Sequence, residues 1–437
     1  MADTPPPLTR RRVAVIGAGV SGLSCAWLLS RTHDVTLFEA SPRLGGHCNT
    51  VEVEGVPVDT GFVVYNEPSY PNLSALLAHL GVPTRETDMS FSVSMNGGAL
   101  EYAGSDLAGL LAQPTNLLRP RFWSMLFDIF RFYREAPLAV AHVGEASLGE
   151  MSLSEFMRAG RYGDPFLRDH LYPMIAAIWS CPAGEAGDLP AAAFIRFCEN
   201  HGLLKILRRP TWRTVVGGSR EYVSRLMAEF RGETVTSTAI VGLRRTPVGV
   251  ELHGTRGVIG TYDDAVLACH ADTALRLLAD PSPEERETLG AFRFTRNETL
   301  LHTDVTHMPQ RRAAWAAWNY SGGTEGVEVT YWMNRLQHLP TDKNWFVTLN
   351  PSRKVQGVAL RMVYTHPVFD VTAMRAKQRL WALQGQRHTW FCGAWFGAGF
   401  HEDGLHAGLT VAEALGGVSR PWTVPHQPGR LPVKAAA

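Results

Sequence analysis

Residues 12–46, RVAVIGAGVSGLSCAWLLSRTHDVTLFEASPRLGG, constrain the fold more than any other stretch of this chain. A short apolar run predicts one buried parallel strand, and it passes without a linker into Gly17-x-Gly19-x-x-Gly22 and an apolar helix. A second apolar run ends at Glu39, about 20 residues after the glycines, where an acidic side chain takes the ribose hydroxyls of a dinucleotide. Strand, glycine turn, helix and acid in this order predict a dinucleotide site.

The three glycines of this turn have separate physical roles. Gly17 permits the tight turn, Gly19 lets the backbone approach a pyrophosphate, and Gly22 lets the helix pack closely against the strand. Free N–H groups and the helix dipole then face the phosphates, and we expect Ala18 and Ser21 to contribute to the same site. A glycine turn without a ligand is the alternative, and the flanking strand, helix and acid argue against it.

The residues after Glu39 indicate which dinucleotide is bound. The run EASPRLGG resembles the E-A-x-x-R-x-G-G continuation of the flavin-containing amine oxidase and phytoene desaturase superfamily, where it holds FAD. The resemblance implies that Arg43 places a guanidinium beside the pyrophosphate and that Gly45 and Gly46 give a second close backbone approach. Most amine oxidases continue with Arg, whereas this chain has His47, to which the sequence assigns no role.

Two further segments resemble FAD-contacting parts of the superfamily. The run DTGF, from Asp59 through Gly61, is similar to the D-x-G-x segment that lies over the flavin, although these two residues would equally form a structural turn. The β run TVTSTAIVGL matches the family's V-x-x-I pattern, which implies that the backbone of Ile240 hydrogen-bonds the adenine ring. A plain sheet hairpin is also compatible with this second segment.

The stretch 389–415, TWFCGAWFGAGFHEDGLHAGLTVAEAL, resembles the superfamily's C-terminal FAD motif. Gly393 ends a strand, and Phe400, Glu402 and Asp403 open a helix of small residues. The N-terminus of this helix would direct its dipole at the flavin edge that becomes negative on reduction. Many relatives have Glu or Asp after the strand-ending glycine, whereas this chain has Ala394. A helix-terminal acid is the alternative interpretation of Glu402.

These motifs predict an α/β protein with a Rossmann-like FAD-binding domain of the glutathione-reductase type 2 family and an inserted, mixed α+β substrate domain. The FAD-binding domain is expected to be discontinuous, because its motifs lie near both ends of the chain. We expect it to comprise residues 1–85, 205–270 and 385–420. The substrate domain would comprise 86–204 and 271–384, followed by an irregular tail over 421–437.

Composition excludes several classes of function. A net charge of +1 without a basic stripe argues against nucleic-acid binding. The six cysteines show no pairing pattern and are expected to be reduced thiols, and no His, Cys or carboxylate cluster has metal-ligand spacing. The N-terminus lacks an apolar signal core and no segment is expected to span a membrane, so we expect a cytoplasmic protein. The oligomeric state is not predicted.

The expected substrate domain is rich in aromatic residues. The segment 117–137, LLRPRFWSMLFDIFRFYREAP, is either an interfacial helix that gives peripheral membrane contact or a core helix with a solvated arginine face, which is favoured. The apolar run 171–182 either lines a tunnel or packs in the core. The aromatic side chains predicted to face the substrate, rather than only to fill a core, are Phe62, Trp179, Trp315, Trp318 and Tyr331.

The expected chemistry is hydride transfer from a C–H bond to N5 of the flavin. Amine oxidases of the superfamily carry a lysine on a strand of the substrate domain, and the comparable strand here, 297–304 (NETLLHTD), has none. Phytoene desaturases and lipid-modifying relatives work without this lysine. The resemblance therefore implies an apolar tunnel for a polyene or an acyl chain.

Four runs of the sequence resemble a bacterial branch of FAD-binding proteins: DTGFVVYN, WAAWNY, VTYWMNRLQ and GAWFGAGFHEDG. This branch is associated with cyclopropane fatty acid synthase-like methyltransferases and with unsaturated or methyl-branched fatty-acid modification. We therefore predict an FAD-dependent oxidoreductase that desaturates or otherwise modifies a fatty-acyl chain. His401 and Glu402 are the candidate catalytic residues.

Two other functions remain open from the sequence. An amine or amino-acid oxidase would need a cage for a cationic substrate, which Glu298, Asp304 and the pair Trp315 and Trp318 would supply. A flavin-dependent double-bond isomerase would use the same cofactor without net redox change.

Overall fold

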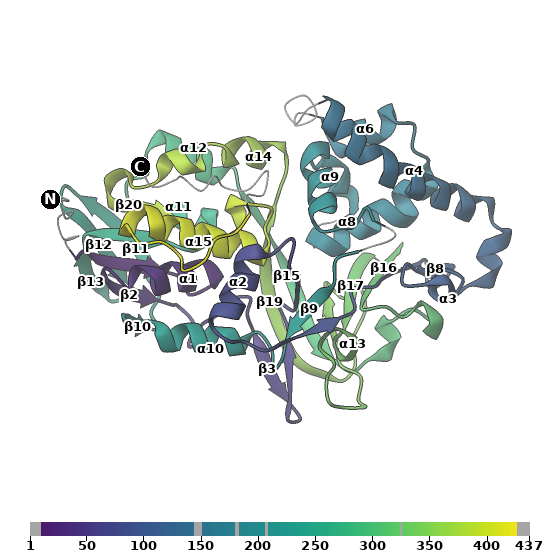
Figure 1. The fold of residues 1–437 in the computed structure, drawn as a ribbon, viewed down its shortest axis with the longest axis horizontal. Coiled ribbons are helices and arrows are strands. Elements are labelled where there is room, and N and C mark those ends of the chain that lie inside the picture. Colours follow the sequence, from purple (N-terminus) through teal and green to yellow (C-terminus); the bar gives the residue numbers. More distant parts are fainter. Residues whose placement is uncertain (1–9, 144–150, 180–182, 206–208, 324–325, 426–437) are drawn as a thin grey trace.

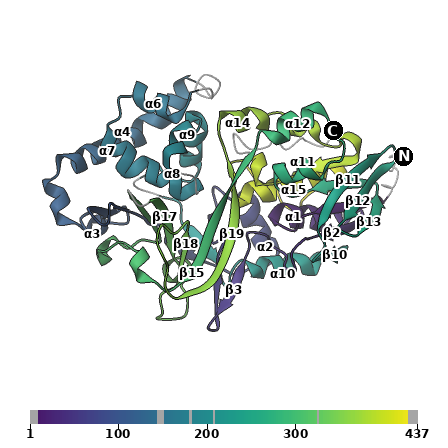
Figure 2. The same ribbon diagram turned by 180° about the vertical axis from the view of Figure 1, so that it is seen from behind.

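The computed structural model describes residues 10–143, 151–179, 183–205, 209–323 and 326–425. Two regions, each built on its own large sheet, lie side by side (Figure 1). Two long antiparallel strands, β15 (Arg293–His302) and β19 (Val358–Val368), run along the boundary between them (Figure 2).

The first region is built on a five-stranded parallel sheet. Its strand order is β10 (Glu233–Val235), β2 (Asp34–Phe38), β1 (Arg12–Ile16), β14 (Asp264–Leu267) and β20 (Thr389–Phe391). Each neighbouring pair is parallel, as in the register that sets Val13 opposite Val35 and Asp264. The three central strands, β2, β1 and β14, bury their apolar side chains, as expected for a parallel sheet that helices cover. The predicted fold, an α/β protein with a Rossmann-like parallel sheet, is confirmed.

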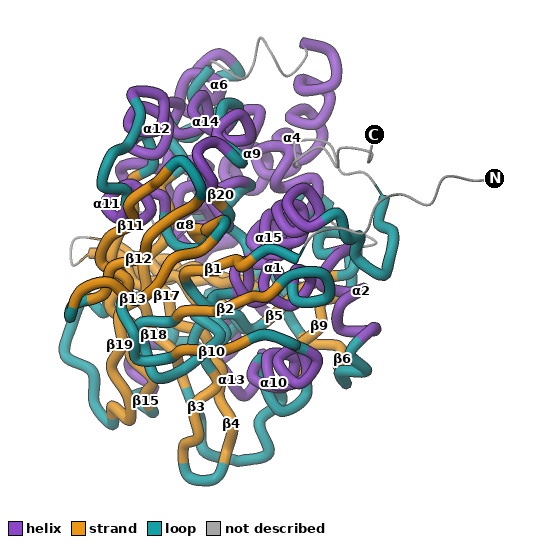
Figure 3. Tube along the Cα trace, turned by 90° about the vertical axis from the view of Figure 1, so that its left-hand side faces the viewer, coloured by secondary structure: helices purple, strands orange, loops and turns teal. Residues whose placement is uncertain are grey.

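Small residues bring two helices of this region together. Helix α1 (Val20–Leu29) follows the glycine turn and packs along α15 (His401–Gly416), and Figure 3 shows the two side by side. A Cβ on Gly408 would stand 2.1 Å from the carbonyl oxygen of Ser21, so only glycine permits this contact. The first and last FAD motifs of the chain are thereby joined in space.

Further elements complete the first region. A three-stranded antiparallel sheet consists of β11 (Ile240–Thr246), β12 (Gly249–Gly254) and β13 (Gly257–Tyr262). It contains the hairpin that the sequence allowed at this place. The remaining helices are α2 (Pro71–His79), α10 (Arg220–Glu229), α11 (Ala271–Leu277), α12 (Pro283–Gly290) and α14 (Val371–Lys377).

The second region is built on a seven-stranded mixed sheet. Its order is β19, β15, β18 (Phe346–Leu349), β17 (Gly326–Trp332), β16 (Trp318–Gly323), β7 (Phe91–Met95) and β8 (Leu100–Ala103). Only the β16–β7 pair is parallel. The helices of this region are α3 (Leu107–Leu110), α4 (Pro120–Val143), α6 (Leu153–Ala159), α7 (Asp164–Phe166), α8 (Tyr172–Trp179) and α9 (Ala191–Asn200).

Short strands connect the two regions. A hairpin of β3 (Thr50–Val53) and β4 (Val56–Asp59) precedes a small antiparallel sheet of β5 (Val64–Asn66), β9 (Trp212–Val215) and β6 (Thr84–Thr87), which lies near α13 (Met333–Gln337). The domain ranges expected from the sequence stay predictions, and the boundary at residue 85 falls inside β6. Residues 421–425 have no regular structure, and the rest of the expected tail lies outside the described residues.

Candidate functional site

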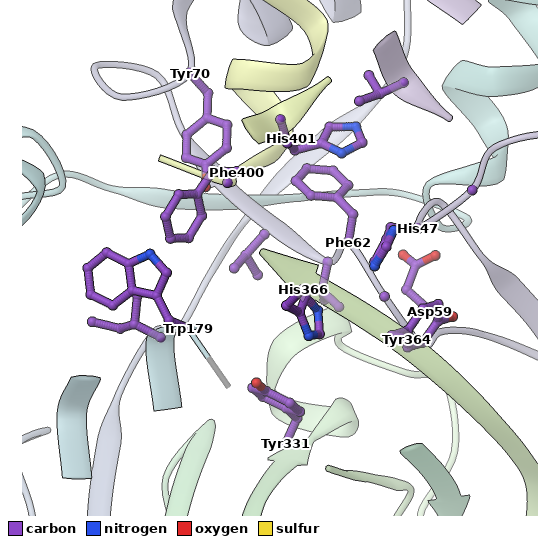
Figure 4. A pocket seen from close by; sticks show the side chains of 18 of the residues that line it. His47, Asp59, Phe62, Tyr70, Trp179, Tyr331, Tyr364, His366, Phe400 and His401 are labelled. Carbon is purple, nitrogen blue, oxygen red and sulfur yellow. The ribbon is translucent and has the colours of Figure 1, made fainter. Parts of the chain in front are cut away.

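A single cavity of about 970 Å³ receives side chains from both regions. One end is lined by the glycine turn, Glu39 and Ile240, and the other by helices α8 and α9 and by strands of the seven-stranded sheet. Figure 4 shows aromatic and histidine side chains that line it. Predicted site residues that line this cavity are Gly17, Ala18, Gly19, Ser21, Glu39, Gly45, Gly46, Asp59, Gly61, Phe62, Trp179, Ile240, Trp318, Tyr331, Gly393, Phe400 and His401.

The glycine turn has the geometry that its sequence predicts. A Cβ on Gly22 would lie 1.8 Å from the carbonyl oxygen of Gly17, so Gly22 is required for packing and does not line the cavity. A Cβ on Gly19 would meet nothing within 4 Å and would project into open space. Gly19 also precedes the first turn of α1, whose free N–H groups bind anions. These features fit the pyrophosphate of a dinucleotide.

Glu39 stands at the carboxyl end of β2, as predicted. Its two carboxylate oxygens accept hydrogen bonds from the backbone N–H groups of Ala18 and Ser41, both at 2.8 Å. Each oxygen retains a further lone pair for a ribose hydroxyl. Ile240, which was expected beside the adenine, lines the same end of the cavity.

Arg43 has a different role from the one its motif implies. Its guanidinium donates hydrogen bonds to the backbone carbonyls of Gly46 at 2.7 Å, Cys48 at 2.8 Å and Leu44 at 3.1 Å. It does not line the cavity, because these bonds hold the side chain against its own loop. Arg43 therefore shapes the loop that brings Gly45 and Gly46 to the site.

Asp59 ends strand β4, and Gly61 lies in the bend that follows it. The flavin contact that the resemblance implies for them stays a prediction. The buried carboxylate of Asp59 accepts hydrogen bonds from Ser219, Thr50 and Gln337, the shortest of them 2.6 Å from the Thr50 hydroxyl. A Cβ on Gly61 would lie 2.2 Å from the carbonyl oxygen of His47. Both residues line the cavity while their contacts hold neighbouring loops together.

The catalytic prediction for Glu402 is not supported by its position. Its carboxylate is buried and accepts hydrogen bonds from the backbone N–H groups of Asn72 and Leu73, at 2.9 Å each, and from the Asn72 side chain at 2.8 Å. The carboxylate thus caps the N-terminus of α2 and does not line the cavity. Asp403 likewise accepts hydrogen bonds from the N–H groups of Ala398 and Phe400 and fixes the loop before α15, away from the cavity.

His401 lines the cavity, but its imidazole is already engaged. Its ring stacks on Phe62 with centroids 4.0 Å apart, and its Nε2 lies 2.6 Å from the hydroxyl of Tyr222. Burial lowers the pKa of His401 to about 3, so the ring is neutral at physiological pH. His401 is placed as part of the cavity wall, and these contacts do not favour the predicted catalytic role.

The predicted aromatic set divides in two. Trp179, Trp318 and Tyr331 line the cavity, whereas Trp315 does not, because its indole N–H donates to the carbonyl of Pro309 and its ring lies 3.7 Å from the guanidinium of Arg312. The amine cage considered from the sequence is not assembled. Of its four members only Trp318 lines the cavity, while Glu298 pairs with Arg361 and Asp304 accepts hydrogen bonds from Thr306 and Gln356.

The apolar run 171–182 contributes directly to the cavity. Met174, Ala177, Ile178 and Trp179 on α8 line it, which favours the tunnel over simple core packing. Residues 180–182 lie outside the described part of the chain, Cys181 among them. The other five cysteines are free thiols. None of the described groups of His, Cys, Asp and Glu has the arrangement of a metal site.

Several residues that line the cavity were not predicted from the sequence, because none of the motifs includes them. His47, His270, Tyr364 and His366 line the cavity near the FAD motifs. The rings of His47 and His366 lie 5.5 Å apart, and those of His47 and Tyr364 4.9 Å apart. The departure from arginine at position 47 was the one available sign. His366 lies on β19, far from any motif, and only the fold brings it here.

Burial makes this group of histidines neutral. It lowers the pKa of His47 to about 3, with further lowering by His366 and His270, and it lowers the pKa of His366 to about 4. Burial also lowers the pKa of His270. These imidazoles therefore act as neutral hydrogen-bonding groups, and the cavity gains no positive charge from them.

Comparison with known proteins agrees with this geometry. The sequence model of a family described as flavin-containing amine oxidoreductase matches residues 20–366. Among curated proteins, a putative flavin-containing monoamine oxidase of Mycobacterium tuberculosis is 29% identical over 59% of this chain and 56% of its own length. A coproporphyrinogen III oxidase of Mycobacterium leprae is 26% identical over 63% of each chain. The chain thus spans roughly three fifths of the length of these relatives.

Solved structures show the same fold at low identity. A fatty acid isomerase from P. acnes that produces CLA superposes with a TM-score of 0.64, at 15% identity, over 91% of this chain and 97% of its own. A putrescine oxidase bound to putrescine superposes with a TM-score of 0.68, at 15% identity, over 93% and 99%. The family match covers well over half of the chain, and the cavity joins the predicted FAD motifs: the chain belongs to the flavin-containing amine oxidoreductase family.

Proposed function

We propose that this chain is an FAD-dependent oxidoreductase that acts on an unsaturated or methyl-branched fatty-acyl group, which it desaturates or otherwise modifies. The observation that carries the proposal is the lining of the cavity beyond the FAD motifs. Apolar and aromatic side chains dominate there, namely Met174, Ile178, Trp179, Phe197, Trp318, Tyr331, Leu336, Val347 and Leu349. Such a lining binds a hydrocarbon chain by removing apolar surface from water.

The charged groups of the cavity give little support to a cationic substrate. No lysine is among the described residues that line it. Asp88 lines the cavity but forms an ion pair with Arg335, and Asp106 accepts a hydrogen bond from the N–H of Gly109 as the cap of α3. An ammonium group would therefore find no unengaged buried carboxylate in Asp88 or Asp106, and Glu86, which also lines the cavity, is exposed to solvent.

The cofactor supplies the redox chemistry, because flavin accepts a hydride from a C–H bond. The protein would bind the acyl chain, orient one C–H bond and exclude water. The residues that would hold FAD are those of the glycine turn, Glu39, the loop of Gly45 and Gly46, and Gly393.

The direct test is to mix the FAD-loaded protein, without oxygen, with unsaturated fatty acids and with phospholipids that carry them, and separately with a panel of amines. We expect the flavin absorption to bleach with the lipids only. Bleaching by an amine alone would overturn the proposal in favour of amine oxidation. Altered double bonds in the lipid without any bleaching would favour the isomerase.

We further propose that the segment 117–137 contacts a membrane surface. Helix α4 buries one face, including Phe122, Met125 and Phe132, and exposes a second apolar face. Exposed side chains on or beside α4 are Leu117, Leu118, Trp123, Phe127, Phe130 and Leu138, of which Phe127 is 68% exposed. The favoured alternative, a core helix with a solvated arginine face, does not account for these aromatic residues.

Charge and position on α4 support a lipid surface as the partner. Exposed Arg119 and Arg134 flank the apolar face and suit lipid phosphates. Tyr133 on the same helix lines the cavity, so α4 would lie between the lipid and the bound acyl chain. No described helix is long and apolar enough to cross a membrane, so the contact would be at the surface.

Sedimentation with vesicles of phosphatidylcholine and phosphatidylglycerol tests this contact. We expect the triple variant Trp123→Ser, Phe127→Ser, Phe130→Ser to lose most vesicle binding. Val248→Ser is the matched control, since Val248 is 82% exposed in the turn between β11 and β12. Equal sedimentation of the triple variant and the wild type would refute the membrane contact and leave the acyl substrate untouched.

A further inference from the structure

The carboxyl end of β19 lies between the two FAD motifs. The hydroxyl of Tyr364 is 2.9 Å from the Asn49 side-chain nitrogen and 2.8 Å from the Thr60 hydroxyl, both in loops that follow the N-terminal motif. On the other side, a Cβ on Gly399 of the C-terminal motif would come within 3.2 Å of Pro367. Thr365, His366 and Pro367 line the cavity at this point. Figure 4 shows the side chain of His366 there. The segment therefore borders the junction of the cofactor end and the apolar end.

A chain of two asparagines fixes the imidazole of His366. Asn350 Nδ2 donates to Asn297 Oδ1 at 2.7 Å, which sets the orientation of the Asn297 amide. Asn297 Nδ2 then donates to His366 Nδ1 at 2.8 Å. Because Nδ1 accepts this bond, the proton of the neutral ring is on Nε2. His366, which lines the cavity, thus carries Nε2–H as its one ring donor.

The origin of Asn297 adds to this arrangement. Asn297 lies on β15, the strand on which the resemblance predicted a lysine and found none. Its side chain is buried, and it is engaged entirely with polar neighbours at the cavity wall. The amide of Asn297 therefore has a cavity histidine as a close hydrogen-bond partner.

The other histidines near the FAD motifs do not share this geometry. His401 Nε2 is bonded to Tyr222, and the ring of His270 stacks on Phe294 at 4.3 Å. His47 Nε2 is buried without a hydrogen-bond partner among the described residues. In this group, His366 has its Nδ1 held by a side-chain amide, which leaves its proton on Nε2.

We propose that His366, positioned by Asn297 and Asn350, donates a hydrogen bond to the ring of the bound FAD. The donor is a neutral imidazole, because burial keeps its pKa near 4. The flavin ring gains negative charge on reduction, so a donor fixed beside it stabilises the reduced form. The proposal rests on FAD as the cofactor and is independent of the acyl substrate.

The test compares His366→Leu, which removes the donor, with His366→Gln, whose amide nitrogen can replace Nε2–H. The FAD-loaded proteins are equilibrated without oxygen against a reference redox dye. We expect the ratio of reduced to oxidised FAD to fall about tenfold in His366→Leu, the effect of losing one hydrogen bond to a charged group. His366→Gln should recover most of the ratio.

His253→Leu is the matched control, since His253 lies on β12 and does not line the cavity. It should leave the ratio unchanged. A wild-type ratio in His366→Leu with FAD fully bound would overturn the proposal. Because this variant can fail to retain FAD, a second measurement uses the unaltered protein.

This second measurement records the imidazole nitrogens of ¹⁵N-histidine-labelled wild-type protein by NMR, with the His366 signals assigned from the His366→Gln spectrum. We expect the Nε2–H tautomer and a shift of the Nε2 signal when bound FAD is reduced. An Nε2 signal that is the same with oxidised FAD, with reduced FAD and without FAD would contradict the proposal, whatever the outcome with acyl substrates.

Discussion

The two ends of the cavity are built in different ways. The cofactor end is formed by short contiguous motifs. In these motifs the backbone atoms of Gly17, Gly19 and Gly46 line the space for the cofactor. The substrate end comes from single side chains on α8, α9 and several strands of the mixed sheet. Backbone geometry is encoded locally and strictly, whereas an apolar wall can be built from many residue combinations. The cofactor end is therefore the part that a sequence reveals, and the substrate end is the part that sets specificity.

The largest expected effects come from substitutions at two glycines of the same turn, one in FAD binding and the other in stability. Gly19→Ala places a methyl group in the open space of the cofactor end, so we expect FAD affinity to fall by at least about a hundredfold with the apoprotein still folded. Gly22→Ala would force a Cβ against the carbonyl of Gly17, so the protein itself should lose about 3 kcal/mol or more of stability. FAD titration and urea unfolding distinguish the two. Equal behaviour of the two variants would break the assignment of separate roles.

Glu402 tests whether the C-terminal motif acts on the cofactor or on the fold. Glu402→Ala leaves three N–H donors at the start of α2 without their acceptor, so we expect a loss of about 2–3 kcal/mol in urea unfolding. The visible spectrum of bound FAD should be unchanged, because the carboxylate does not line the cavity. An unaltered stability together with lost flavin reduction would restore the catalytic interpretation.

The buried histidines of the cavity make the stability of the protein depend on pH. The pKa values of His47, His366 and His401 are about 3, 4 and 3 in the folded protein and near 6.5 when unfolded. Below pH 6.5 the unfolded chain therefore binds more protons than the folded protein. The stability that the three neutral histidines allow is present above pH 6.5 and is lost as the pH falls toward 3.

The slope is about 1.4 kcal/mol per pH unit for each proton taken up on unfolding. Unfolding free energies measured between pH 7 and pH 4 should fall less steeply in the double variant His47→Gln, His401→Gln. An identical slope in the variant and the wild type would show that these rings are charged or solvated in the folded protein.

The smallest expected effect is a change in the preferred length of the acyl substrate. Ile178→Trp would narrow the apolar end without touching the cofactor motifs. We expect the preferred acyl chain to become shorter, with a loss of about tenfold in the rate of flavin bleaching for the longest chain. A series of fatty acids of increasing length, with FAD affinity as the internal control, measures the change. A uniform loss at all lengths would place Ile178 outside the substrate path.

Sequence reasoning reached the parallel sheet, the glycine turn and the FAD cofactor because each depends on local spacing. It misplaced Arg43 and Glu402 because a motif gives a residue type and not the direction of its side chain. Hydrogen bonds to a loop and to α2 determine where these two side chains point. His366 was not predicted because its role depends on Asn297, which is 69 residues away in the sequence and adjacent in the sheet.

The central claim is that one cavity holds FAD beside a hydrocarbon chain and that electrons pass between them. A single anaerobic turnover with an unsaturated phospholipid tests it most directly, with the reduced flavin measured by absorption and the acyl product by mass. We predict one reduced flavin for each acyl chain that has lost two hydrogen atoms. Reduced flavin formed from an amine, with every acyl chain unchanged in mass and double-bond position, would contradict the account.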